Sequence, residues 1–226
     1  MTSRLLISFT LGAAGLVAGC HTTPSTPIDD LAAEAGLQRA QTVRLDALYV
    51  NPNVTFGDYK KVLLRPVVVS FRESWRPERT GTHFQLSATE MNRLKQDFET
   101  TFMRVFAHEL QARDGYELVS APGPGVLEIR ARITDLFIPA ADLSRYSITR
   151  TRTFVRDGSE MTLTAEVRDS LSGQVLSRAY DQGRATTNPT FEEANRLTNT
   201  MDARRIISTW ATQLRSSFDG SRTDRT

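Results

Sequence analysis

The chain has one cysteine, Cys20, and only three histidines among its 226 residues. A single thiol excludes a disulfide within the chain. The histidines stand at positions 21, 83 and 108, and no second histidine follows His108-Glu109 at the spacing of a zinc protease. Donors this scattered do not make a usual zinc site, so we expect no metal and no cofactor.

Catalytic motifs and a basic stripe are missing as well. The chain has no Gly-x-Ser-x-Gly elbow, and no histidine has an evident orienting partner, so we expect a non-enzymatic protein without catalytic residues. Its 28 basic and 26 acidic residues nearly balance at a net charge of +2, and all but three of the basic residues are arginine. This near balance does not favour a nucleic-acid partner.

Beyond residue 17 the sequence has no long apolar run, and the apolar run near the N-terminus is short. Residues 5–17 are apolar and uncharged, and at about 13 residues they are too short for a membrane span and typical of a signal peptide. The run ends in Leu16-Val17-Ala18-Gly19-Cys20. We expect cleavage between Gly19 and Cys20, with residues 1–19 as the signal peptide and Cys20 as the site of lipid attachment.

The alternative to a lipoprotein is a plain secreted protein, or an N-terminal anchor with an incidental cysteine. Against it, an unpaired thiol is a liability in an oxidising compartment, and Cys20 stands where bacterial lipoproteins carry their lipid. Residues 20–28, with Pro24 and Pro27, are then the lipidated cysteine and a tether. In bacterial lipoproteins an aspartate after the cysteine favours retention in the inner membrane. His21 stands there, so we expect anchoring on the outer membrane, facing the periplasm, with the inner membrane as the alternative.

Two helical patterns and two alternating patterns define the rest of the chain. Ser87-Ala88-Thr89-Glu90 is a capping box before an apolar stripe that runs from Met91 to Phe106, and Thr190-Phe191-Glu192-Glu193 is a second one. Residues 127–133 and 161–168 alternate strictly between apolar and polar side chains, which indicates an antiparallel sheet with one buried and one solvent-exposed face. Residues 169–173 form a hairpin turn.

The apolar residues 59–71 predict a further strand, which Pro66 makes an edge strand or interrupts with a bulge. Together these patterns predict a single α+β domain over residues 29–218. Its sheet is mostly antiparallel, and its two long helices pack side by side on one face. Residues 219–226 are expected to be a frayed tail.

Several blocks of the sequence resemble a known family. They are Tyr49-Val50-Asn51-Pro52, the stretch 59–64 with Pro66-Val67, Glu166-Val167-Arg168-Asp169-Ser170 with Gly173 and Asp181, and Trp210-Ala211. In order and spacing they resemble the proteobacterial lipoproteins known as domain of unknown function 3313. Ser172 departs from this pattern, since threonine is commoner there. The resemblance implies an exported lipoprotein domain and no established activity.

The most suggestive candidate contact site is the arginine cluster Arg145, Arg150, Arg152 and Arg156. It is either a solvated face, which charge patterning favours, or a contact for acidic groups of a protein or of lipid heads. The predicted function is an envelope interaction module held on the membrane by the lipid on Cys20. The alternative is a carrier that binds a small ligand or lipid in a cleft between sheet and helices. The oligomeric state stays open.

Overall fold

The computed structural model describes residues 25–42, 44–75, 86–138, 153–155, 158–185, 192–194 and 196–223. The predicted signal peptide, Cys20 and the four arginines of the candidate cluster lie outside these residues. No helix of the described part is both long and apolar enough to cross a membrane.

The domain is built on one eight-stranded sheet, with the strand order β1-β2-β9-β8-β6-β3-β5 and with β4 also paired to β6. The predicted α+β class with a mostly antiparallel sheet is confirmed. The strands of this sheet are β1 Gln38–Arg39, β2 Ala47–Val50, β3 Lys61–Leu64, β4 Val68–Phe71, β5 Glu117–Leu118, β6 Val126–Phe137, β8 Glu160–Asp169 and β9 Val175–Arg184. The helices are α1 Asp29–Glu34, η1 Phe56–Asp58, α2 Ala88–Gln111 and α3 Arg196–Thr223.

The three central strands follow the alternation of the sequence. β6 pairs antiparallel with β8, and β8 with β9, through the predicted turn at residues 169–173. In that turn the Asp169 carboxylate accepts the N–H groups of Leu171 and Ser172, and Gly173 adopts a φ of 72°. This is the local chemistry of an Asx turn that closes on glycine.

Pro66 divides the predicted strand 59–71 into β3 and β4, both parallel to β6. The pairing runs from Lys61 opposite Val126 to Leu64 opposite Ile129, and it resumes with Val68 opposite Arg132. Between the two strands the Arg65 N–H still donates to the Ile129 carbonyl oxygen, at 3.0 Å. Among the described strands β4 pairs with β6 alone, as expected of an edge, whereas β3 lies between β6 and β5 and is not an edge strand.

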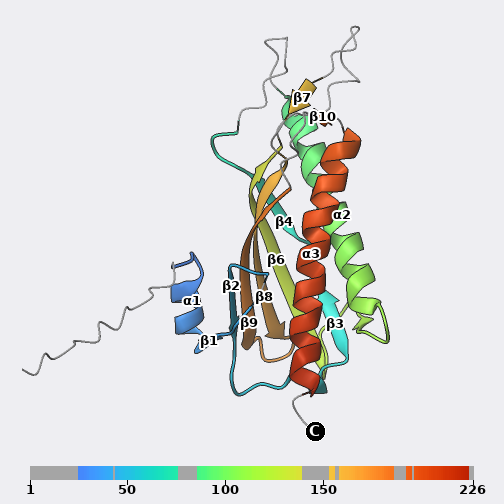
Figure 1. Ribbon diagram of the computed structural model, residues 1–226. Coiled ribbons are helices and arrows are strands. Elements are labelled where there is room, and N and C mark those ends of the chain that lie inside the picture. The colour runs from blue at the N-terminus through green and yellow to red at the C-terminus, as the bar shows by residue number, and fades with distance from the viewer. Residues whose placement is uncertain are drawn as a thin grey trace, which may run out of the picture.

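The two long helices cover one face of the sheet, side by side (Figure 1). The capping box of α2 is confirmed, because Ser87 and Glu90 exchange both of its hydrogen bonds. Below it, Phe98, Phe102, Phe106 and Leu110 recur every fourth residue and are buried against the sheet.

The second predicted helix start is wrong. Glu192–Ala194 forms strand β10, which pairs with β7 (Thr153–Val155), and α3 begins at Arg196. The capping-box pattern assigned these residues to a helix, but their backbone groups pair with β7 instead. From Arg196 the helix runs without interruption to Thr223, past the expected tail boundary at 219.

The contact between α3 and β9 is close. A Cβ built on Gly183 would stand 2.3 Å from an Ile206 side-chain atom and 2.8 Å from Trp210. Trp210 is 1% exposed, and Ile207 on the same helix is fully buried. The absence of a side chain at Gly183 therefore allows α3 to lie directly on the sheet, and no room for a ligand is left at this contact.

The opposite face of the sheet, called the open face below, is covered differently. At the β2–β9 side the short helix α1 lies over it (Figure 1), and Ile28, Ala32 and Leu37 form a small cluster with Ala47, Tyr49 and Tyr180. Polar residues of β6, β8 and β9 occupy the rest of this face, whereas Asp181 of β9 faces α3.

Candidate functional site

Arginine and glutamate alternate on the open face because of the strand period. Apolar Leu127, Ile129 and Ala131 of β6 join the core under the helices, so the residues between them point to the other face. Those residues are Glu128, Arg130 and Arg132. Among the described residues, three glutamates of this face are each bonded by two arginines, and we call each group a triad.

The Glu128 triad joins β6 to the residue after β3. Arg65 Nε lies 2.9 Å and Arg130 Nε 2.7 Å from the same oxygen, Oε1 of Glu128. The Glu128 side chain is only 6% exposed, whereas Arg130 is 55% exposed. Burial raises the pKa of the Glu128 carboxyl, but the hydrogen bonds and charges of Arg130 and Arg65 outweigh it and hold the pKa below 4.5. The carboxylate therefore stays ionised beneath two guanidinium groups.

The Glu166 triad lies next to it on β8 and β9. Arg168 Nε bonds Oε1 of Glu166, and Arg178 Nη2 bonds Oε2 at 2.6 Å. Arg130, Glu166, Arg178 and Tyr49 stand opposite one another on neighbouring strands. The Arg178 side chain is only 13% exposed, and its Nε and Nη1 are buried without an acceptor. The first two triads thus form one row of alternating charge across β6, β8 and β9, and the row ends at the uncharged Tyr49 of β2.

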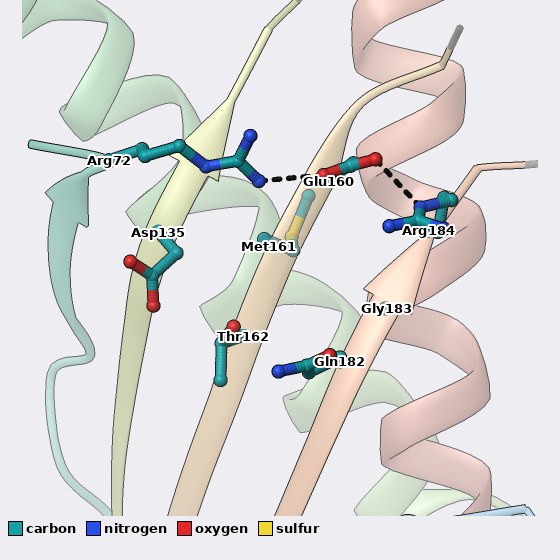
Figure 2. A pocket seen from close by; sticks show the side chains of 8 residues that line it. All are labelled: Arg72, Asp135, Glu160, Met161, Thr162, Gln182, Gly183 and Arg184. Atoms are coloured by element: carbon teal, nitrogen blue, oxygen red, sulfur yellow. Dashed lines mark hydrogen bonds and ion pairs between the residues drawn. The ribbon is translucent and has the colours of Figure 1, made fainter. Parts of the chain in front are cut away.

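The Glu160 triad stands at the far end of the open face and lines a pocket (Figure 2). Arg72 Nη2 lies 2.6 Å from Oε2 of Glu160, and Arg184 Nε lies 2.7 Å from Oε1. The hydrogen bond from Arg72, with the charge of Arg184, holds the pKa of Glu160 below 4.5 against the opposing effect of burial. Arg184 itself is 70% exposed.

Between the first two triads and the third lies Arg132, whose neighbours on the adjacent strands are uncharged. Arg132 stands opposite Thr164, and Thr164 stands opposite Tyr180. Arg132 is exposed and forms no ion pair among the described residues, and its neighbour on β4, Val68, is 57% exposed. Here the open face presents an uncompensated guanidinium beside an exposed apolar side chain.

The open face is electropositive by a simple count. Two guanidiniums and one carboxylate leave each triad with one positive charge, and Arg132 adds another, while the carboxylate of Asp135 near the pocket subtracts one. Guanidiniums that share a carboxylate are held in fixed orientations and keep N–H donors free. Such an arrangement can receive carboxylate or phosphate groups from outside.

The sequence pointed to a different arginine cluster. Arg145, Arg150, Arg152 and Arg156 lie outside the described residues, and so does the predicted lipid site at Cys20. From the sequence, the triad residues of β6 and β8 could be recognised only as the solvent-facing polar positions of two strands whose side chains alternate between apolar and polar. A signal was present, since Glu128-x-Arg130-x-Arg132 and Glu166-x-Arg168 place opposite charges on one face. In the described part, no group of three histidine, cysteine, aspartate or glutamate side chains could hold a metal ion.

Comparisons with known proteins identify the family and little beyond it. One family model matches residues 28–214, and its description is a protein of unknown function, DUF3313. No curated protein matches.

Solved structures resemble the chain only distantly. One is the PelC dodecamer from Paraburkholderia phytofirmans, with 10% identity, a TM-score of 0.37 and coverage of 79% of this chain and 96% of that one. A second is a DUF330 protein from Xanthomonas campestris, with 12% identity, a TM-score of 0.37 and coverage of 83% and 97%. A third is a putative neuraminyllactose-binding hemagglutinin homolog from Helicobacter pylori, with 12% identity, a TM-score of 0.39 and coverage of 75% and 95%.

Proposed function

This protein belongs to the DUF3313 family, whose description assigns no function, and we propose that it is a non-enzymatic interaction module of the cell envelope. In this proposal a lipid on Cys20 holds the domain on the outer membrane, facing the periplasm. The open face then docks an acidic protein partner. The observation that carries the docking role is the set of three triads, each with one net positive charge, around Arg132, which has no ion pair in the described part of the chain.

The anchor rests on the N-terminal sequence. Residues 1–19 have the length and composition of a signal peptide, and Gly19-Cys20 stands at the point of cleavage. A fully processed bacterial lipoprotein carries three acyl chains, more than the two hydrophobic signals that stable anchoring requires. Replacement of Cys20 by alanine should abolish labelling with a palmitate analogue and release the protein from the membrane pellet. Continued labelling, or a gradient profile that follows inner-membrane markers, would contradict this part of the proposal.

The docking role rests on how the arginines are held. A free surface arginine loses side-chain entropy when a partner fixes it, whereas a guanidinium already bound to a shared carboxylate loses less. Arginine also binds carboxylates through two parallel hydrogen bonds, which gives specificity as well as attraction. An acidic protein surface that lies against the open face would use both properties, the fixed guanidiniums and the paired hydrogen bonds to carboxylates.

A protein partner fits better than a membrane surface. Attraction to anionic lipid relies on clustered, uncompensated charges, commonly flexible lysines. On the open face each glutamate neutralises one of its two arginines, and Arg132 is the one arginine of β6, β8 and β9 that forms no ion pair among the described residues. Few net charges in fixed positions favour recognition of particular carboxylates over diffuse attraction.

The alternative function, a carrier with a cleft between sheet and helices, has less support. The atoms of Ile206 and Trp210 would collide with a Cβ at Gly183, so α3 and β9 are in direct contact. The large aromatic side chains of α2 also fill this layer, since Phe102 and Phe106 are fully buried and stack at 4.0 Å between ring centroids.

The docking role is tested with the full-length protein crosslinked in membranes and then purified in detergent. Arg130→Gln with Arg132→Gln removes two exposed positive charges from the open face, and Arg93→Gln with Arg104→Gln removes two from the exposed side of α2. We expect the first pair to reduce recovery of an acidic crosslinked protein and the second pair to leave it unchanged. Recovery should also fall when salt is raised before crosslinking, because exposed charge contacts are screened.

Equal recovery from the two pairs of variants would contradict the docking role. Arg132→Gln alone is the control for misfolding, because Arg132 forms no ion pair with any of the described residues that its replacement would break. A thermal melt of each variant gives the same control directly. Binding to phosphatidylglycerol vesicles that the first pair loses and the second keeps, without a crosslinked protein, would identify lipid as the partner instead.

A further inference from the structure

The pocket at the Glu160 triad combines both charges around a small space. Its volume is about 190 Å³, below the roughly 300–1,000 Å³ of sites for drug-sized ligands. Arg72, Glu160 and Arg184 stand in a row along one side, and Asp135 of β6 also lines the pocket (Figure 2). Thr162 and Gln182 add a hydroxyl and an amide. The occupant must therefore be small and polar.

Asp135 reaches the pocket because β6 is irregular at this point. Its φ is 54°, in the left-handed region, and the pairing of β6 with β8 shifts register between Thr134 and Phe137. With regular alternation Asp135 would point into the core like Ile133, but the bulge turns it outward and places Leu136, fully buried, in the core. Non-glycine residues in this conformation are strained, and such strain gathers at functional sites.

Within the described part of the chain, the Asp135 carboxylate has no cationic partner. It is exposed, and its hydrogen bond among the described residues is the one from the Thr134 hydroxyl, at 3.1 Å. It therefore offers a negative charge to a group that enters the pocket.

The arginines on the other side offer positive donors. Arg72 bonds Glu160 through Nη2 and Arg184 bonds it through Nε. A guanidinium has five N–H donors, so each arginine keeps donors for a second acceptor. The two guanidiniums and the two carboxylates of Glu160 and Asp135 cancel in total charge. A simple anion or cation thus gains no net attraction, whereas a molecule with both charges meets its opposite at each end.

We propose that this pocket binds a small zwitterion of the α-amino acid type. Its ammonium group bonds Asp135, and its carboxylate bonds the remaining N–H groups of Arg72 and Arg184. Glu160 stays ionised between the two arginines and fixes their orientation. The proposal does not depend on the docking role, because it concerns a ligand that binds without a protein partner.

Titration calorimetry on the full-length protein in detergent tests the proposal. The probes are glycine, L-alanine, L-serine and L-glutamate, with propionate and ethylamine as the two halves of alanine. We expect at least one amino acid to bind at least about tenfold more tightly than either half, since loss of a charged hydrogen bond costs roughly 1.5–3 kcal/mol. Absence of binding by all four amino acids, or equal binding by propionate or ethylamine, would overturn it.

A pair of matched variants locates the site. Asp135→Asn keeps a residue type that tolerates a left-handed backbone but removes the negative charge. Asp114→Asn makes the same change at another exposed aspartate, with a φ of 55°, in the turn after α2. We expect the first to weaken amino-acid binding about tenfold or more and the second to leave it unchanged. Arg184→Gln should weaken it too. An unchanged affinity in Asp135→Asn would overturn the proposal.

Discussion

Trp210 on α3 donates its indole N–H to the carboxylate of Asp181 on β9, at 2.7 Å. The other oxygen of Asp181 accepts the backbone N–H of Asp46, at 3.1 Å, so one carboxylate links the helix layer, the sheet and the segment before β2. Burial raises the pKa of Asp181 above its ordinary value, and the charge of Asp46 adds to this, although the Trp210 bond opposes it. The group that connects α3 to the sheet is thus a carboxylate in an environment that disfavours its ionised form.

The first prediction concerns the indole donor. Trp210→Phe keeps a large aromatic ring but leaves a partly buried carboxylate without its N–H, so the free energy of unfolding should fall by about 1.5–3 kcal/mol. Trp75→Phe is the matched control, because the Trp75 indole donates to a neutral carbonyl, that of Ile138, at 3.0 Å. The control should lose about 0.5–1.5 kcal/mol. Urea unfolding followed by circular dichroism measures both, and a larger loss in Trp75→Phe would contradict the role given to Asp181.

The second prediction concerns the pH dependence of stability. Because the folded pKa of Asp181 is raised, the folded state holds this proton more tightly than the unfolded state, whose pKa is near 3.8. The contribution of Asp181 is therefore fully present below that value and is lost as pH rises through the folded pKa. Asp181→Asn cannot titrate. Between pH 4 and 7, the stability of Asp181→Asn relative to the unaltered protein should rise with pH in urea melts. A constant difference over that range would show that the pKa is not raised.

The sequence predicted the elements whose patterns are local. The alternation of β6 and β8, the turn at Asp169 and the capping box at Ser87 all follow from residues within a few positions of one another. The start of α3 was misplaced because the pairing of Glu192–Ala194 with β7 involves a distant segment. The parallel pairing of β3 and β4 with β6 was also invisible, since no local pattern states which strand a segment joins.

The candidate site was harder to predict for the same reason. Glu128 and Arg130 are two residues apart, but Arg65 reaches Glu128 only because β3 lies beside β6. Likewise, Arg72 and Arg184 meet at Glu160 from different strands. Asp135 could not be assigned to the open face at all, because strict alternation places it in the core and the bulge reverses it.

The third prediction concerns the start of α2. The Ser87 hydroxyl accepts the N–H of Glu90 at 3.3 Å, and the Glu90 carboxylate accepts the N–H of Ser87 at 2.7 Å. Ser87→Ala removes the first bond and should lower the free energy of unfolding by about 1 kcal/mol. Ser87→Thr keeps a capping hydroxyl and should lose much less. Equal losses in the two variants, measured in urea, would mean that the cap contributes little to this helix.

The last prediction concerns the four arginines that the sequence singled out, Arg145, Arg150, Arg152 and Arg156. Charge patterning favours a solvated face for them, and exposed charges contribute little to stability. Replacement of all four by glutamine should therefore leave the thermal melt and the recovery of the crosslinked acidic partner nearly unchanged. The same two measurements on Arg132→Gln alone, which keeps the bond from Arg130 to Glu128, should show an unchanged melt and a reduced recovery. If the fourfold variant lost the partner and kept its melt while the open-face variant kept both, docking would belong to the predicted cluster and not to the triads. If both variants lost the partner in a salt-dependent way, the two groups of arginines would act on the same acidic surface.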